Sequence, residues 1–264
     1  MKRLIVILFS ACIFISECSL GAGFVKSTSF VWFAGAGTSE AITLTGVTVS
    51  DLLVICVFWN DNTQTISTIS GNGNVYMPVD TQSSASFGGT ATYYVKSAVS
   101  GNTTITVSWG ADPSFGGLVA HEVSGMNTSA PLDQHIINTQ VNPGLGTDAI
   151  TSTAKTPVAN GEYIFGCNFD NGGGSLSESA GTNFTIRENN AASLFTASED
   201  LGATGIQSTA ANIAATFTTN PSETSAVTAL MTFKQPAVTA SASNSLFKIN
   251  GAQVIINGAQ VTIN

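Results

Sequence analysis

The sequence predicts an all-β fold, an antiparallel two-sheet β-sandwich that is jelly-roll-like. Charged residues make up only 9% of the 264 residues, whereas about 25% is typical of globular proteins; Ser, Thr, Asn and Gly take their place. Threonine and the branched apolar residues favour strands, while Gly and Asn favour turns. Strand-like segments recur about every 8–15 residues between Gly/Asn/Ser/Pro clusters, a spacing typical of a sandwich or barrel.

The strand pattern is clearest in two segments. Residues 52–59 (LLVICVFW) are apolar on both faces, which predicts a central strand that is covered on both sides. Residues 103–109 alternate between apolar and polar side chains, which predicts a strand with one buried face. No segment has the sustained 3.6-residue period of a helix. The predicted strands are residues 24–33, 41–49, 52–59, 75–80, 91–96, 103–109, 118–123, 150–156, 162–169, 184–188, 194–199, 213–218 and 226–233.

Residues 1–23 are expected to be a signal peptide. The start is positively charged (KR), residues 4–15 form an apolar run, and small residues follow at 19–23. The run of about 12 residues is too short to cross a bilayer as a helix, which needs about 20, so no transmembrane helix is expected in the mature form. Cleavage is expected after Gly21. The alternative is a buried N-terminal strand.

Cys18 offers a second way of processing the same leader. The sequence Ile15-Ser16-Glu17-Cys18 loosely resembles a bacterial lipoprotein box, in which the cysteine is lipidated after cleavage, although Glu17 stands where a small residue is usual. The expected localisation is therefore secreted or cell-surface, and with lipidated Cys18 the protein would be an outer-membrane lipoprotein.

The charge balance excludes a class of partner. The formal net charge is −8, and the chain has eight Lys and Arg residues, two of them in the leader. A nucleic-acid-binding protein needs a basic surface to meet phosphates, so no nucleic-acid partner is expected. Attraction to anionic membranes through charge is excluded for the same reason.

The C-terminal region differs from the predicted sandwich domain (24–235). Residues 236–246 are a small-residue linker, and residues 247–264 contain the repeat INGAQVI–INGAQVT. Its two Asn-Gly dipeptides favour two-residue hairpin turns. They predict a small hairpin or meander whose strand edges have unpaired backbone groups that can pair with other strands. This tail is expected either to dock on a protein partner or self-associate, or to pack on the sandwich.

Ordered segments of the chain resemble a widespread group of bacterial exported and phage-associated β-sandwich domains of unassigned function. The resemblance covers about residues 27–235, and its most specific piece is HEVSG followed by PLD; the usual Tyr of that motif is Val123 here. It implies a sandwich fold and a surface or secreted location, and it implies no catalytic residues. The other matching pieces are residues 50–59, 69–79, 91–109, 159–166, 184–188 and 227–234.

His121 and Glu122 are the obvious candidates for acid–base chemistry. Neighbours on a strand point to opposite faces, so they cannot act together on one substrate atom. The sequence has no nucleophile elbow and no phosphate-binding loop, and it indicates no cofactor. Structural calcium is an open alternative, with ligands at Asp61 or at Glu199 and Asp200.

Cys56 and Cys167 each lie in an apolar strand. They could form one disulfide if these strands face each other, and the slightly favoured alternative is two small buried side chains.

The predicted function is that of an exported, non-enzymatic module for adhesion, glycan binding or cell-surface architecture. The alternatives are a virion component, such as a phage tail or capsid decoration protein, and a secreted glycoside-active hydrolase with two converging carboxylates. The oligomeric state stays open. Sugar rings stack on aromatic faces, so the candidate glycan-binding residues are Trp59, Phe87, Tyr93, Tyr94, Trp109 and Phe115; the alternative is that all six are packing residues.

Overall fold

The chain is all-β, as predicted. The computed structural model describes residues 21–33, 35, 37–141, 148–170, 177–190, 195–220, 225–237, 254–256 and 259–261. In this part of the chain, strands form four sheets between residues 23 and 233 and a separate strand pair near the C-terminus, and every pairing is antiparallel. The described chain is therefore an all-β sandwich with more sheets than the two predicted.

The first half of the domain contains a five-stranded and a three-stranded sheet. The larger sheet has the spatial order β1 (Gly23–Trp32), β8 (Gly116–Ser124), β3 (Leu52–Trp59), β6 (Gly88–Val95) and β5 (Met77–Ser84). The smaller sheet has the order β2 (Ser39–Val47), β7 (Gly101–Trp109) and β4 (Ile66–Ser70). We call this pair of sheets the first sandwich.

The second half contains a six-stranded and a three-stranded sheet, which we call the second sandwich. The larger sheet has the order β13 (Phe184–Asn190), β14 (Phe195–Leu201), β11 (Glu162–Asp170), β17 (Ser225–Phe233) and β9 (Leu132–Val141), with the short β15 (Ile206–Gln207) also paired to β11. The smaller sheet has the order β10 (Asp148–Thr151), β16 (Thr216–Asn220) and β12 (Ser177–Ala180).

The two sandwiches have the same topology. Read in chain order, β1 to β6 correspond to β9 to β14, β7 corresponds to β16, and β8 to β17; each strand then has the same neighbours in both halves. The register places Cys56 opposite Thr92 and Val119, and Cys167 opposite Ser198 and Ala229. The two cysteines therefore occupy equivalent positions, and the domain is an internal duplication.

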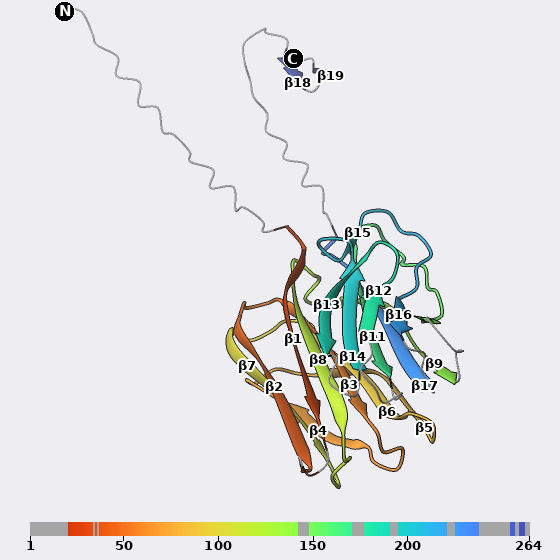
Figure 1. Ribbon diagram of the computed structural model, residues 1–264. Coiled ribbons are helices and arrows are strands. Elements are labelled where there is room, and N and C mark those ends of the chain that lie inside the picture. The colour runs from red at the N-terminus through yellow and green to blue at the C-terminus, as the bar shows by residue number, and fades with distance from the viewer. Residues whose placement is uncertain are drawn as a thin grey trace, which may run out of the picture.

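The four sheets stack as layers, with the two large sheets inside (Figure 1). Alternate residues of β3 explain this order. Val54, Cys56 and Phe58 belong to the core between the two large sheets, whereas Ile55 and Val57 belong to the core between the large and small sheets of the first sandwich. The prediction that residues 52–59 form a central strand covered on both faces is confirmed.

The two sandwiches meet face to face, with strands β3 and β11 running in the same direction. Phe58 stacks on its equivalent Phe169 with ring centroids 5.0 Å apart. At the other end of these strands, His121 pairs with Val54 of β3 and forms a hydrogen bond with Tyr163, near the start of β11. We call the end at which β3 and β11 begin the proximal end of the domain.

The edge strands of the large sheets also contact each other in equivalent pairs, β1 with β13 and β5 with β9. In the first pair, the Ser29 hydroxyl donates to Glu188 Oε2 at 2.7 Å. In the second pair, His135 Nδ1 lies 2.7 Å from Asp80 Oδ2. The edges of the large sheets, which would otherwise offer unpaired backbone to other chains, are therefore partly covered by the opposite sandwich.

Four strands were absent from the sequence prediction: β4, β9, β12 and β15. Strands β4, β12 and β15 are short, and β9 (LDQHIINTQV), whose described side chains are half-buried at the edge of the sheet, is rich in polar residues. In the tail, β18 (Val254–Ile256) pairs with β19 (Ala259–Val261) on either side of Asn257-Gly258, where a hairpin turn was predicted. Asn250-Gly251 lies outside the described residues.

Candidate functional site

The interface between the two large sheets is apolar at its centre and covalently closed. Cys56 and Cys167 form a disulfide across it, with Cα atoms 6.8 Å apart. The two cysteines are equivalent in the duplication, so the bond lies near the approximate two-fold axis that relates the sandwiches. Gly117 allows the close approach, because a Cβ atom there would lie 1.9 Å from Thr196 Oγ1 of the other sandwich.

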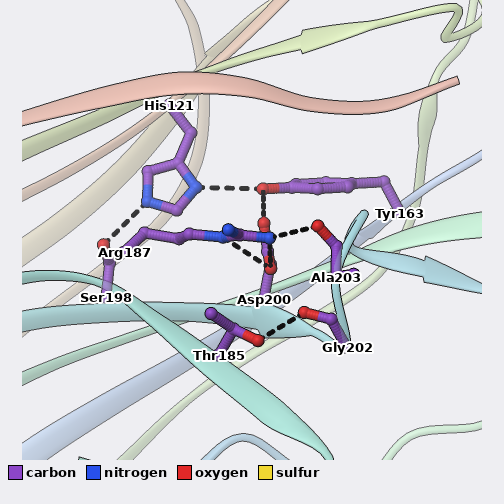
Figure 2. A network of polar contacts seen from close by, with 8 residues as sticks. All are labelled: His121, Tyr163, Thr185, Arg187, Ser198, Asp200, Gly202 and Ala203. Carbon is purple, nitrogen blue, oxygen red and sulfur yellow. Dashed lines mark hydrogen bonds and ion pairs between the residues drawn. The ribbon is translucent and has the colours of Figure 1, made fainter.

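One polar network interrupts this apolar interface at the proximal end (Figure 2). The Tyr163 hydroxyl donates to Asp200 Oδ2 at 3.1 Å. Because this uses the only proton of the phenol, Tyr163 accepts at its oxygen from His121 Nδ1–H, 2.9 Å away. The Nε2 atom of the neutral imidazole is then an acceptor for the Ser198 hydroxyl at 2.7 Å. The hydrogen bonds run in one direction, from Ser198 through His121 and Tyr163 to Asp200.

Arg187 ends the network on the other side of Asp200. Its Nε and Nη2 atoms lie 2.9 and 2.8 Å from Asp200 Oδ1, and Nη2 also donates to the carbonyl oxygen of Ala203 at 2.7 Å. The guanidinium carbon lies 4.0 Å from the centroid of the Phe24 ring, a cation–π contact. The guanidinium is 15% exposed and the carboxylate is fully buried, so this is an ion pair that folding has largely removed from water.

The electrostatics fix His121 in its neutral form. Burial, with a smaller contribution from the nearby Arg187 charge, lowers the pKa of His121 to about 3. Burial raises the pKa of Asp200, and the Arg187 ion pair opposes this. Ser198 and neutral His121 have the contact of a nucleophile and its general base. However, all four residues of this hydrogen-bonded chain are fully buried: Ser198, His121, Tyr163 and Asp200. No substrate atom therefore reaches the serine in this conformation.

A second polar group lies at the proximal end of the first sandwich. Lys26 Nζ lies 3.0 Å from Glu122 Oε2 and donates to the carbonyl oxygens of Thr45 and Gly46. Burial and a hydrogen bond with Glu122 raise the pKa of Asp51 to about 7. As predicted from strand geometry, Glu122 and His121 point to opposite faces of β8.

The second sandwich repeats this arrangement with different residues. Glu162, the equivalent of Asp51, accepts from the backbone N–H of Ala159, and Asp133 accepts from that of Val158. In the first sandwich, Glu122 accepts from the backbone N–H of Thr48. The shared feature is a carboxylate that holds the loop before the central strand, which indicates a structural role in both halves.

The structure corrects part of the aromatic prediction. Trp59, Phe87 and Trp109 are buried, so these rings offer no face to a sugar. Trp59 and Trp109 do lie together, with ring centroids 6.2 Å apart, in a core cluster with Trp32. The remaining three candidates are half-buried and pack against the cores: Tyr93, Tyr94 and Phe115.

The predicted calcium ligands do not converge. Asp61 is half-buried and accepts hydrogen bonds from the backbone N–H and the hydroxyl of Thr63. Glu199 accepts from the backbone N–H groups of Gly181 and Thr216, on the opposite face of β14 from Asp200. Within the described ranges, no three His, Cys, Asp or Glu side chains form a group that could hold a metal ion.

Glu199 gives a testable pH dependence. Burial raises the pKa of Glu199 from 4.5 to about 8, although the two backbone hydrogen bonds act to lower it. A raised pKa in the folded state means that the carboxyl stabilises the fold fully below pH 4.5 and loses this contribution as the pH rises through about 8. Glu199→Gln should therefore flatten the fall in the free energy of unfolding between about pH 6 and pH 8, as measured by urea titration. Asp51 contributes a fall of the same sign, so an unchanged slope in the variant would contradict the assignment to Glu199.

Some predictions fall on residues outside the described ranges. Cys18 and most of the leader are among them, as is most of the tail. Within the described ranges, no helix has the length and apolar character that crossing a membrane would require.

The sequence pointed to His121, as a histidine beside the carboxylate of Glu122, but to neither Tyr163 nor Ser198 as its partners. They come from strands 42 and 77 residues further along the chain, and no local pattern marks them. Comparisons of the chain with protein-family models, curated proteins and solved structures find no match.

Proposed function

We propose that the chain is an exported, non-catalytic binding or structural module that acts at a cell surface or outside the cell. The observation that carries this proposal is the Cys56–Cys167 disulfide, which closes the interface between the sandwiches. Structural disulfides persist in oxidising compartments and are rare in the cytosol. The disulfide thus agrees with the apolar leader that precedes Gly21.

The enclosed network supports a non-catalytic role. Ser198, His121 and Asp200 have the chemical types of a hydrolase triad, yet a tyrosine separates the histidine from the aspartate and all are fully buried. A nucleophile must come within reach of a substrate atom. The network instead joins the two sandwiches, because His121 belongs to the first and its partners to the second.

The working surface is then on the outside of the sandwiches. The described aromatic rings with the largest exposure are Phe30 and Phe33, which are 39% and 48% exposed. A ligand of low charge suits a chain with few lysines and arginines. A neutral glycan or an uncharged protein surface is the partner class that this composition favours.

Export is tested by the mature N-terminus. When the full chain is expressed in a bacterium with its own leader, mass spectrometry should find a protein that starts after Gly21, or a lipidated Cys18, in the extracytoplasmic fraction. Peptide mapping without reductant should recover Cys56 and Cys167 in one cross-linked fragment. An intact Met1 in assembled particles would contradict export and favour a virion component.

Glycan binding is tested separately with the purified mature protein on an array of cell-surface and plant polysaccharides. Phe33→Ala should weaken any binding about two- to twelvefold, since a stacking contact on an aromatic side chain contributes about 0.5–1.5 kcal/mol beyond the area it buries. Val158→Ala, a matched truncation of an exposed side chain at the proximal end, should leave it unchanged. Retention on no glycan would exclude the glycan version and leave a protein partner.

A further inference from the structure

The first sandwich exposes an apolar surface at its proximal end. Val49, Val75 and Val99 lie on the loops that follow β2, β4 and β6, and they are 62%, 69% and 43% exposed. These three residues, which we call the valine surface, are among eight large apolar side chains that are exposed in the described part of the chain. Single exposed apolar residues are ordinary, but three at the same end of one sandwich suit a contact with another apolar surface.

Hydrogen bonds hold the three loops to one another. The backbone N–H of Ser50 donates to the carbonyl oxygen of Ala98 at 2.9 Å. The backbone N–H of Val99 donates to Asn74 Oδ1 at 2.8 Å, and the side-chain amide of Asn72 donates to the carbonyl oxygen of Val99 at 3.3 Å. The valine surface is therefore fixed before any partner binds, which lowers the entropic cost of binding.

The C-terminal segment 249–264 has the matching chemistry. It contains no charged residue, and six of its residues are Ile or Val. Within it, β18 and β19 form a pair of strands. An isolated two-stranded hairpin is at best marginally stable in water, so such a pair needs another surface to pack against.

The described part of the domain ends just after Lys234, which lies beside the first sandwich and at the same end as the valine surface. The backbone N–H of Asn127, three residues after β8, donates to the carbonyl oxygen of Lys234, 2.9 Å away. Strand β8 pairs with β3, and β3 pairs with β6. With about 4.8 Å between neighbouring strands, the loops with Val49 and Val99 lie roughly 10–15 Å from the end of β8.

The length of the connection suits this distance. Residues 238–253 separate the described domain from β18, and a chain of this length can span at most roughly 55 Å. A connection that can reach the site gives a tethered segment an effective concentration on the order of millimolar. At micromolar protein concentration, a weak apolar contact within the chain would therefore form to a greater extent than the same contact between two chains.

We propose that the C-terminal segment 249–264 docks on the valine surface of its own chain. The segment then covers Val49, Val75 and Val99, and the sandwich provides the packing that the β18–β19 pair lacks alone. This proposal does not depend on the proposed function, since it concerns a contact within the chain.

Trypsin cleavage after Lys248 tests the contact in the full mature chain. Lys248 is the one lysine or arginine between residues 235 and 264, and the protease must bind residues on both sides of the cleaved bond. Cleavage, followed by mass spectrometry, should be at least about tenfold slower in the unmodified chain than in the Val49→Asp/Val75→Asp/Val99→Asp variant, which corresponds to about 1.4 kcal/mol. Val75→Asp alone should give a smaller increase in rate.

Phe33→Asp is the matched control. Phe33 is 48% exposed and follows the last residue of β1, which ends opposite the proximal end, so this variant should be cleaved at the unmodified rate. Equal rates in the unmodified chain and the triple variant would overturn the proposal. Protection that grows with protein concentration, together with dimers in light scattering, would also overturn it, because the contact would then be with a second copy. If the triple variant does not fold, the comparison of Val75→Asp with Phe33→Asp decides.

Discussion

Replacing Cys56 with alanine should lower the free energy of unfolding by about 3–5 kcal/mol. The disulfide closes a loop between residues that are 111 positions apart, and a loop of about 100 residues corresponds to about 4.7 kcal/mol in the chain-entropy description. The bond also joins the two sandwiches, so its loss removes a link between the halves as well as a constraint on the unfolded chain. Urea unfolding of the purified mature protein, followed by fluorescence, measures the change.

Cys167→Ala and the double variant provide the control. Either single substitution removes the same bond, so the double variant should lose about as much stability as each single variant, rather than the sum. A reducing agent should destabilise the unmodified protein and leave the variants unchanged. A loss below about 1 kcal/mol in the double variant would show that packing alone holds the sandwiches together.

The sequence predicted the fold class because its strongest signals are local. The apolar run 52–59 predicted a strand covered on both faces, and β3 is such a strand. The same observation already implied a sheet on each side of β3, which two packed sheets cannot supply. The extra layers therefore had a signal in the sequence, although their number depended on strands such as β4 and β12, which are too short to show a period.

The duplication could not be recognised in the sequence, because equivalent residues have diverged. The pairing register makes Trp59 equivalent to Asp170, and His121 equivalent to Met231. Two pairs of identical residues on β3 and β11 point to the duplication, Cys56 with Cys167 and Phe58 with Phe169, and the cysteines were interpreted as one disulfide or as two buried side chains. The meaning of these pairs appears only when the strand order of both halves is known.

The polar network shows where sequence reasoning stops. Strand alternation correctly placed His121 and Glu122 on opposite faces, which separates their roles. It could not identify Tyr163 or Ser198, because these lie on strands of the other sandwich that contact β8 through packing rather than through pairing. Burial also had to come from the structure, and burial is what distinguishes this network from an accessible serine–histidine pair.

Asp200→Ala should destabilise the fold by about 3–5 kcal/mol, because breaking a buried ion pair leaves an uncompensated charge. Arg187 would keep its contact with the Phe24 ring and the Ala203 carbonyl oxygen but lose its carboxylate, and the Tyr163 hydroxyl would lose its acceptor. Thermal and urea unfolding of the purified variant should both report the loss.

The matched variant replaces both ions at once. Asp200→Leu/Arg187→Met exchanges the pair for apolar side chains of similar size, and such exchanges of buried pairs are often neutral or stabilising. It should recover most of the stability that Asp200→Ala loses. If the network served only to fill space, the free energy of unfolding of both variants would lie within about 1 kcal/mol of that of the unmodified protein. If instead the double variant were less stable than Asp200→Ala, the other contacts of Arg187, with the Ala203 carbonyl oxygen and the Phe24 ring, would outweigh the cost of its unpaired charge.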